Sequence, residues 1–146
     1  MKRLSALCVV VLLLSGCSQK AAFEELANGA CSSEQAQLVD AHISAQIDAM
    51  AQQDWKLAYS FASPGFRSGV DIDQFIFIIN AQFGMLLDNQ GYAFNACTIA
   101  DEKITQEVAI NTDSEVFNLY YTLSVTGGVL GVDSSSSTLS QTKLET

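Results

Sequence analysis

The spacing of apolar residues predicts a long amphipathic helix over residues 32–53. Four large apolar side chains recur every three or four positions in this segment, namely Val39, Ile43, Ile47 and Met50. This spacing places them on one face of a helix, which we expect to be buried. Ser32 or Ser33 precedes the helix, and a serine is a good N-cap because its side chain accepts a hydrogen bond from a free backbone N–H.

Two further helices are predicted after the long one. Asp54 is a good N-cap for a short helix that ends at Ser63-Pro64-Gly65, because the residue before a proline avoids the helical conformation. Asp71 and Gln74 have the spacing of a capping box and start the third helix. Its apolar residues keep helical spacing for about four turns, and they are Ile72, Phe75, Ile76, Ile79, Phe83, Leu86 and Leu87. Gly91 follows the C-terminal end of this helix.

After Gly91 the pattern changes to alternation, which is typical of half-buried strands. Strands are predicted over residues 92–99, 103–111 and 115–126. The third has the clearest pattern, since one of its faces is almost wholly apolar and should lie against the core. The residues of this face are Phe117, Leu119, Tyr121, Leu123 and Val125.

The C-terminal segment, residues 129–146, is rich in serine and threonine and follows a break at Gly127-Gly128. It either contributes an edge strand near residues 137–140 or is mobile, and the sequence leaves both alternatives open. Helices followed by strands predict one α+β domain over residues 32–146. In this fold class the N-terminal helices pack on one face of an antiparallel sheet.

The first seventeen residues form a separate unit. Two basic residues precede an apolar run from Leu4 to Leu14, which is typical of a secretory signal and shorter than the roughly 20 residues of a spanning helix. The sequence Leu14-Ser15-Gly16-Cys17 resembles the lipobox of bacterial lipoproteins. The resemblance implies that residues 1–16 are a lipoprotein signal peptide and that Cys17 becomes a lipid-bearing N-terminus. The alternative is an ordinary cleaved signal that a cysteine follows by chance.

The lipoprotein resemblance also implies a location in the cell envelope, anchored to a membrane and facing outside the cytoplasm. Ser18 follows the lipid-bearing cysteine, which is typical of sorting to the outer membrane where the source has two membranes. We interpret residues 17–31, which are small and polar, as a tether that lifts the domain off the bilayer. The expected partners are therefore the membrane, through the anchor, and a protein of the envelope.

Charge narrows the classes of partner. Removing residues 1–16 leaves 130 of the 146 residues and takes away two basic residues but no acidic one, so the formal net charge changes from −9 to −11. Nucleic acid and anionic lipid head groups repel such a surface, and we predict no nucleic-acid partner. The acidity itself is sufficiently explained by solubility.

Four cysteines are present, and two of them have other fates under the lipoprotein interpretation. Cys8 leaves with the signal peptide and Cys17 carries the lipid. Cys31 and Cys97 then remain in an exported, oxidising compartment, where we expect a disulfide between them. Such a bridge closes a long loop and stabilises the domain by about 4 kcal/mol in the chain-entropy account. The alternative is a pair of buried free thiols.

The helical half of the domain resembles the nuclear-transport-factor-2-like superfamily. The matching pattern is Gln46-x-x-Ala49, Asp54-Trp55-x-x-Ala58-Tyr59, Ser63-Pro64-x-Phe66 and Phe75. The resemblance implies a cystatin-like cone, in which a curved sheet wraps a long helix and the mouth often holds a ligand. The Ser/Thr-rich end departs from the large apolar last strand of that family, and it leaves open whether the cone is complete at its C-terminal end.

Several side chains are candidates for a ligand pocket at the mouth of the cone. They are Trp55, Tyr59, Phe66 and Tyr121, and the alternative is that they belong to the core. Enzymes of the superfamily use an acid–base pair, but the only histidine, His42, has no carboxylate three or four residues away on its helix. We therefore predict no catalytic residue, and the ligand types in the chain predict no metal site and no cofactor.

Three functions remain open from the sequence. The first is a non-enzymatic accessory or interaction module held at the membrane. The second is a binder of a small apolar ligand at the cone mouth. The third is an acid–base enzyme centred on His42.

Overall fold

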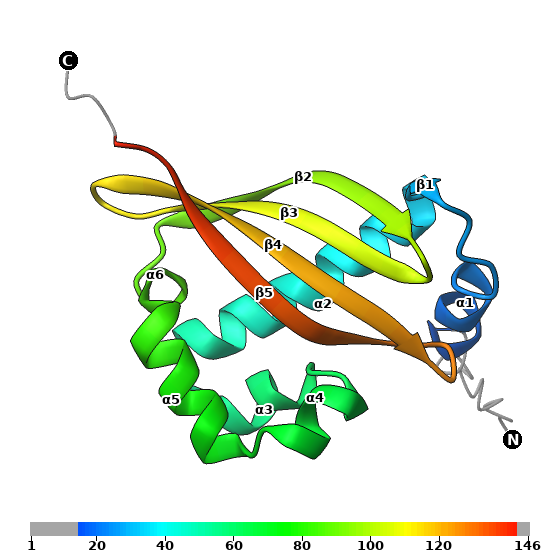
Figure 1. Ribbon diagram of the computed structural model, residues 1–146, viewed down its shortest axis with the longest axis horizontal. Helices are drawn as coiled ribbons and strands as arrows, with labels where there is room; N and C mark the ends of the chain where they lie inside the picture. Colours follow the sequence, from blue (N-terminus) through cyan, green and yellow to red (C-terminus); the bar gives the residue numbers. More distant parts are fainter. Residues whose placement is uncertain (1–14, 143–146) are drawn as a thin grey trace, which may run out of the picture.

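The computed structural model describes residues 15–142 (Figure 1). The predicted signal peptide lies outside these residues except for Ser15 and Gly16. The helices are α1 (Ser15–Ala22), α2 (Ser33–Ala51), α3 (Trp55–Ser60), α4 (Pro64–Gly69), α5 (Ile72–Gln82) and α6 (Gly84–Leu87). The strands are β1 (Gly29–Ala30), β2 (Gly91–Ala100), β3 (Lys103–Asn111), β4 (Glu115–Thr126) and β5 (Val129–Thr142). No helix in this described part is long and apolar enough to cross a membrane.

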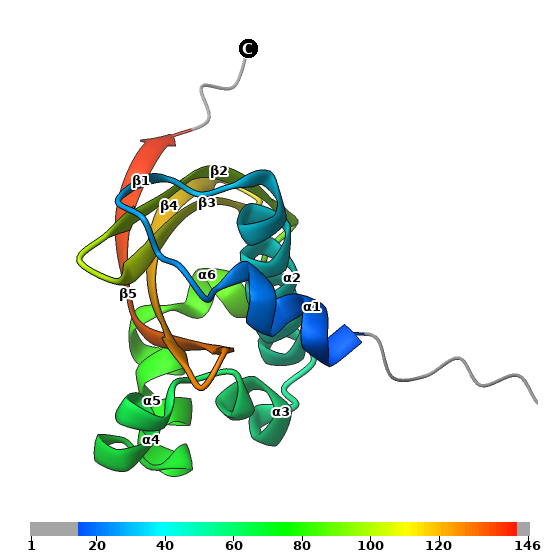
Figure 2. The same cartoon turned by 90° about the vertical axis from the view of Figure 1, so that its right-hand side faces the viewer.

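The five strands form one antiparallel sheet in the order β1-β2-β3-β4-β5. The sheet is curved, and α2 lies along its inner side (Figures 1 and 2). Helices α3 to α6 extend the helical layer toward β5, so the core lies between this layer and the sheet. The predicted α+β class, with N-terminal helices packed on a curved antiparallel sheet, is confirmed.

The long helix begins and packs as the sequence predicts. Ser32 and Gln35 form a capping box, in which the Ser32 hydroxyl accepts from the Gln35 N–H and the Gln35 side chain accepts from the Ser32 N–H. Val39, Ile43 and Ile47 are fully buried against the sheet. The amphipathic face of α2 therefore forms the centre of the core.

The helical segment between residues 55 and 87 is more divided than predicted. The short helix α3 already ends at Ser60, so Pro64 does not terminate it. Pro64 instead opens α4, because Ser63 caps this helix and a proline at the first helical position needs no N–H partner. The predicted third helix breaks at Phe83, where the backbone has φ −126° and ψ 32°, and α6 follows as a separate turn. This break turns both Phe83 and Leu86 into the core.

The C-terminal segment is ordered as a strand for most of its length. β5 pairs with β4 from Val129 to Thr142, so the described part of the tail is a strand, and this strand is much longer than residues 137–140. The N-terminal part of β5 also pairs with residues 61–63, since the Ser63 N–H donates a hydrogen bond to the Val132 carbonyl at 2.9 Å. A serine run has a weak apolar pattern and therefore does not predict a strand. β5 forms because its backbone groups pair with the edge of β4 that β3 does not occupy.

Residues 17–31 do not form a free tether. Phe23 is buried in the core, and β1 pairs with the end of β2. Cys31 and Cys97 are joined by a disulfide, with Cα atoms 5.4 Å apart, so the expected bridge is confirmed. The interpretation of this segment as a spacer is therefore wrong for the residues from Phe23 onward.

Candidate ligand pocket

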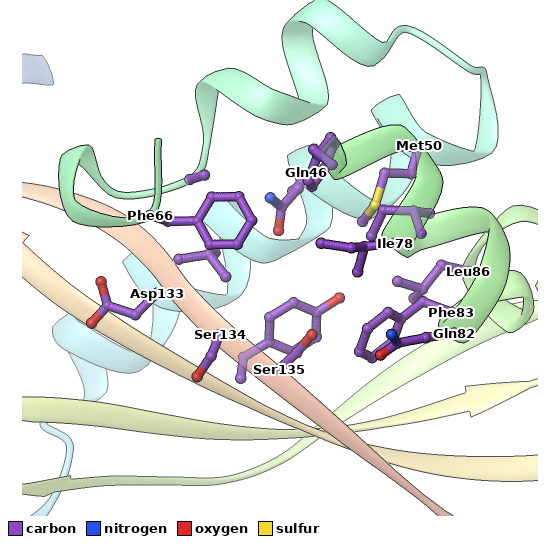
Figure 3. A pocket seen from close by; sticks show the side chains of 15 residues that line it. Gln46, Met50, Phe66, Ile78, Gln82, Phe83, Leu86, Asp133, Ser134 and Ser135 are labelled. Atoms are coloured by element: carbon purple, nitrogen blue, oxygen red, sulfur yellow. The ribbon is translucent and has the colours of Figure 1, made fainter. Parts of the chain in front are cut away.

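A pocket of about 180 Å³ lies between α5 on one side and β5 on the other (Figure 3). Its walls also include parts of α2, α4, α6 and β4. The lining residues are Gln46, Met50, Ala62, Phe66, Phe75, Ile78, Ile79, Gln82, Phe83, Leu86, Tyr121, Val132, Asp133, Ser134 and Ser135. Most of this wall is apolar, and the polar side chains are few, which is the usual composition of a small-molecule site.

Aromatic contacts hold the helical wall in place. The rings of Phe66 and Phe75 pack edge to face, with centroids 6.2 Å apart, and this contact joins α4 to α5. Tyr59 also packs against Phe75, with ring centroids 5.6 Å apart. The local sequence allows this arrangement because Ser63 and Asp71 cap two short helices in succession and so fold the chain back on itself.

Gln46 contributes a polar atom from the buried face of α2. Its Nε2 donates to the Ala58 carbonyl at 3.2 Å, and because a carbonyl only accepts, this contact fixes which end of the amide is nitrogen. The amide oxygen then points into the pocket, as Figure 3 shows. It has no hydrogen-bond partner among the described residues.

Tyr121 contributes a second polar atom from β4. The side chain is 1% exposed, and its hydroxyl has no hydrogen-bond partner in the described part of the chain. Burial raises the pKa of the Tyr121 phenol far above its usual range, and the neighbouring Tyr92 raises it further. The phenol is therefore a neutral hydrogen-bond donor at any physiological pH.

Asp133 lies at the mouth of the pocket, at a bulge in β5 where the pairing with β4 shifts. Its carboxylate accepts hydrogen bonds from Lys103 Nζ at 2.7 Å and Ser124 Oγ at 2.8 Å. Burial alone would raise the pKa of Asp133, but hydrogen bonds from Lys103, Ser63 and Ser124 lower it. The mouth thus carries one carboxylate whose charge is already neutralised.

A comparison with protein families matches residues 32–128 to the family described as Domain of unknown function (DUF4864). The chain belongs to this family. No curated protein and no solved structure matches the chain. The DUF4864 match covers α2 to β4, so it includes Gln46 and Tyr121 but not the β5 wall of the pocket.

The structure brings together two of the four residues that the sequence suggests for a pocket in this DUF4864 domain. Phe66 and Tyr121 line it. Tyr59 contacts Phe75 but does not line the pocket, and its hydroxyl already donates a hydrogen bond to the Val70 carbonyl at 2.8 Å. Trp55 is half-buried at the edge of the core and does not line the pocket.

His42 lies outside the pocket. Its Nε2 is 2.9 Å from the Phe61 carbonyl oxygen, so this nitrogen carries the hydrogen, and its ring packs edge to face on Phe61. Burial lowers the pKa of His42, although the Phe61 hydrogen bond partly opposes this. These contacts give the histidine a structural role between α2 and the segment that pairs with β5.

Sequence reasoning missed most of the polar lining. Gln46 was visible as a polar residue beside the apolar stripe of α2, and this position was the available signal. The contribution of Ser134 and Ser135 had no comparable signal, because these residues belong to a serine run. Among the described residues no group of three or more potential ligands is placed to hold a metal ion.

Proposed function

We propose that this protein is a non-enzymatic, lipid-anchored lipoprotein of the bacterial cell envelope that binds a small, uncharged and largely apolar molecule. The molecule occupies the pocket between α5 and β5. One observation carries the proposal: an apolar pocket is lined by two polar atoms without a hydrogen-bond partner among the described residues, the buried Tyr121 hydroxyl and the amide oxygen of Gln46, whose side chain is 3% exposed. Buried polar groups are normally hydrogen-bonded, and a ligand would supply the missing contacts.

The two polar atoms suggest the chemistry of the ligand. Tyr121 donates and the Gln46 oxygen accepts, and a hydroxyl group can both accept and donate, so an alcohol matches the chemistry of these two atoms. Among the described residues that line the pocket none is a lysine or an arginine, and the one carboxylate, Asp133, is already paired with Lys103. A charged ligand would lose its hydration without gaining a partner, which favours an uncharged one.

The size of the pocket favours a compact ligand. An apolar cavity of about 150 Å³ accommodates benzene, and this pocket has a volume of about 180 Å³. We therefore infer a body of about the size of one aromatic ring or a short branched chain.

The anchor rests on the leader and on the chemistry of the mature chain. Leu14-Ser15-Gly16-Cys17 has the pattern of a lipobox. The disulfide between Cys31 and Cys97 is typical of proteins outside the cytosol. In a bacterium with two membranes, Ser18 after the cysteine favours the outer membrane.

The pocket is tested with benzyl alcohol and ethylbenzene, two probes of nearly the same shape that differ by a hydroxyl in place of a methyl. Titration calorimetry should show that benzyl alcohol binds to the unsubstituted protein about tenfold more tightly than ethylbenzene does, because only the alcohol forms a hydrogen bond with the buried Tyr121 hydroxyl. Tyr121→Phe should remove most of this preference. Tyr120→Phe is the matched control, because the neighbouring side chain lies on the outer face of β4 and does not line the pocket.

Equal binding of the two probes, or the same loss in both variants, would contradict the proposed site. The anchor is tested separately by mass spectrometry of the native N-terminus. An acylated Cys17 is expected, and Cys17→Ala should release the protein from the membrane fraction.

A second candidate function is an interaction module for another envelope protein. Phe77 is 72% exposed on α5, beside a groove formed by Val70, Asp73 and Gln74. Exposed aromatic residues beside a groove are typical of protein interfaces. Photo-crosslinking from position 77 in intact membranes should give one discrete adduct, and the same crosslinker at position 139 should not.

A further inference from the structure

The chain between the anchor and the folded body is very short. Cys17 lies in α1 and Phe23, six residues later, is buried in the core. At the rise of an α-helix these six residues span about 9 Å, and even a fully extended chain would span only about 20 Å.

Hydrogen bonds tie this short connection to α2. Gln35 Nε2 donates to the carbonyls of Ala22 and Glu25, at 3.0 and 3.3 Å. Gln35 Oε1 accepts a hydrogen bond from the Ser32 N–H. Both ends of the buried amide therefore bond to the backbone on the N-terminal side of α2. An anchored Cys17 therefore keeps the start of the folded body within about 20 Å of the bilayer.

The tip of the β4–β5 hairpin lies directly against α1. Gly127 and Gly128 form the turn with positive φ angles, and a Cβ added at Gly128 would lie 2.6 Å from the Cγ of Lys20. Lys20 is three residues after Cys17, so the hairpin tip lies within about one helical turn of the anchoring residue. Figures 1 and 2 both show the hairpin tip beside α1.

The next residue of the tip, Val129, is 61% exposed. An exposed valine beside a lysine fits the interface of a bilayer, where the apolar group enters the head-group region and the ammonium group stays at the phosphate level. The rest of this end is acidic, since Glu24 and Glu25 are exposed. Contact should therefore be limited to the hairpin tip.

We propose that α1 and the β4–β5 hairpin tip form the membrane-facing end of the protein, with Val129 in contact with the bilayer that carries the anchor. This inference rests on the proposed lipidation of Cys17. It fixes the orientation of the domain: the opposite end, where β5 finishes, points away from the membrane (Figure 1).

The test uses the lipidated chain in phosphatidylcholine vesicles, with Val129→Cys labelled by nitrobenzoxadiazole. The native cysteines do not compete, because Cys17 is acylated and Cys31 is bonded to Cys97. Leu139→Cys is the matched control, since it is a 54% exposed apolar residue at the other end of β5. The label at position 129 should emit at shorter wavelength, and aqueous iodide should quench it at least about threefold less than the label at position 139.

Co-flotation with the vesicles separates the two proposals. A chain that does not float lacks the anchor, and both the lipidation and the orientation fail. A chain that floats but shows equal quenching at the two positions keeps the anchor and overturns the orientation. Hydrogen exchange of the unsubstituted lipidated chain provides a readout without a label, since amides 127–129 should exchange more slowly on vesicles than in soluble Cys17→Ala.

Discussion

Replacing Tyr121 with phenylalanine should stabilise the ligand-free protein. The substitution keeps the ring in the core and removes only a hydroxyl that is buried and has no partner among the described residues. An unpartnered buried hydroxyl costs about 1–3 kcal/mol. We expect a gain of about 1–2 kcal/mol in the free energy of unfolding, or a rise of about 3–8 °C in Tm for a domain of this size.

Urea unfolding in a soluble Cys17→Ala background measures this gain, with Trp55 fluorescence and circular dichroism as the two probes. Tyr120→Phe removes the same hydroxyl from an exposed position and should change the free energy of unfolding by less than about 0.5 kcal/mol. Saturating benzyl alcohol should then stabilise the unsubstituted protein more than Tyr121→Phe, since only the former offers the buried donor.

A loss of stability in Tyr121→Phe would refute the reasoning. It would mean that the hydroxyl is already satisfied in the empty protein, for example by bound water. The pocket would then have no unmet hydrogen bond, and the main support for a hydroxyl-bearing ligand would disappear.

Three further predictions use the same unfolding assay. Gly131→Ala should cost about 1–3 kcal/mol, because the added Cβ would lie 2.5 Å from a backbone atom of the segment that pairs with β5, whereas Gly69→Ala meets open space and should be tolerated. Burial lowers the pKa of His42, so the unfolded chain binds a proton more readily than the folded one. Stability should therefore fall as the pH drops below about 6.5 and level off below the folded pKa, and His42→Gln should lose less between pH 7.5 and 5. Equal losses would contradict this. Replacing Cys31 and Cys97 together with alanine should cost up to about 4 kcal/mol, since the bridge spans 66 residues, and a cost below about 1 kcal/mol would show that it adds little constraint.

Local patterns were sufficient for the elements with a strong periodicity. The stripe on α2 and the alternation along β4 each place several large apolar residues on one face, and burial of that face leaves one choice of structure. The disulfide was expected once Cys8 and Cys17 had been assigned to the leader and the anchor, with two free thiols as the alternative. Pro64 shows the limit of such rules, because a proline is equally compatible with the end of one helix and the first residue of the next.

The sequence by itself determined the α+β class, the buried faces of α2 and β4, and the pairing of two cysteines. Only the tertiary structure decided that β5 continues the sheet, because its serines pair through backbone groups that any residue carries. It also decided the pocket, since Gln46, Tyr121 and Asp133 come from three separate elements. Periodicity reports which side of an element is buried, but it does not report which element lies opposite, and a binding site depends on that second fact.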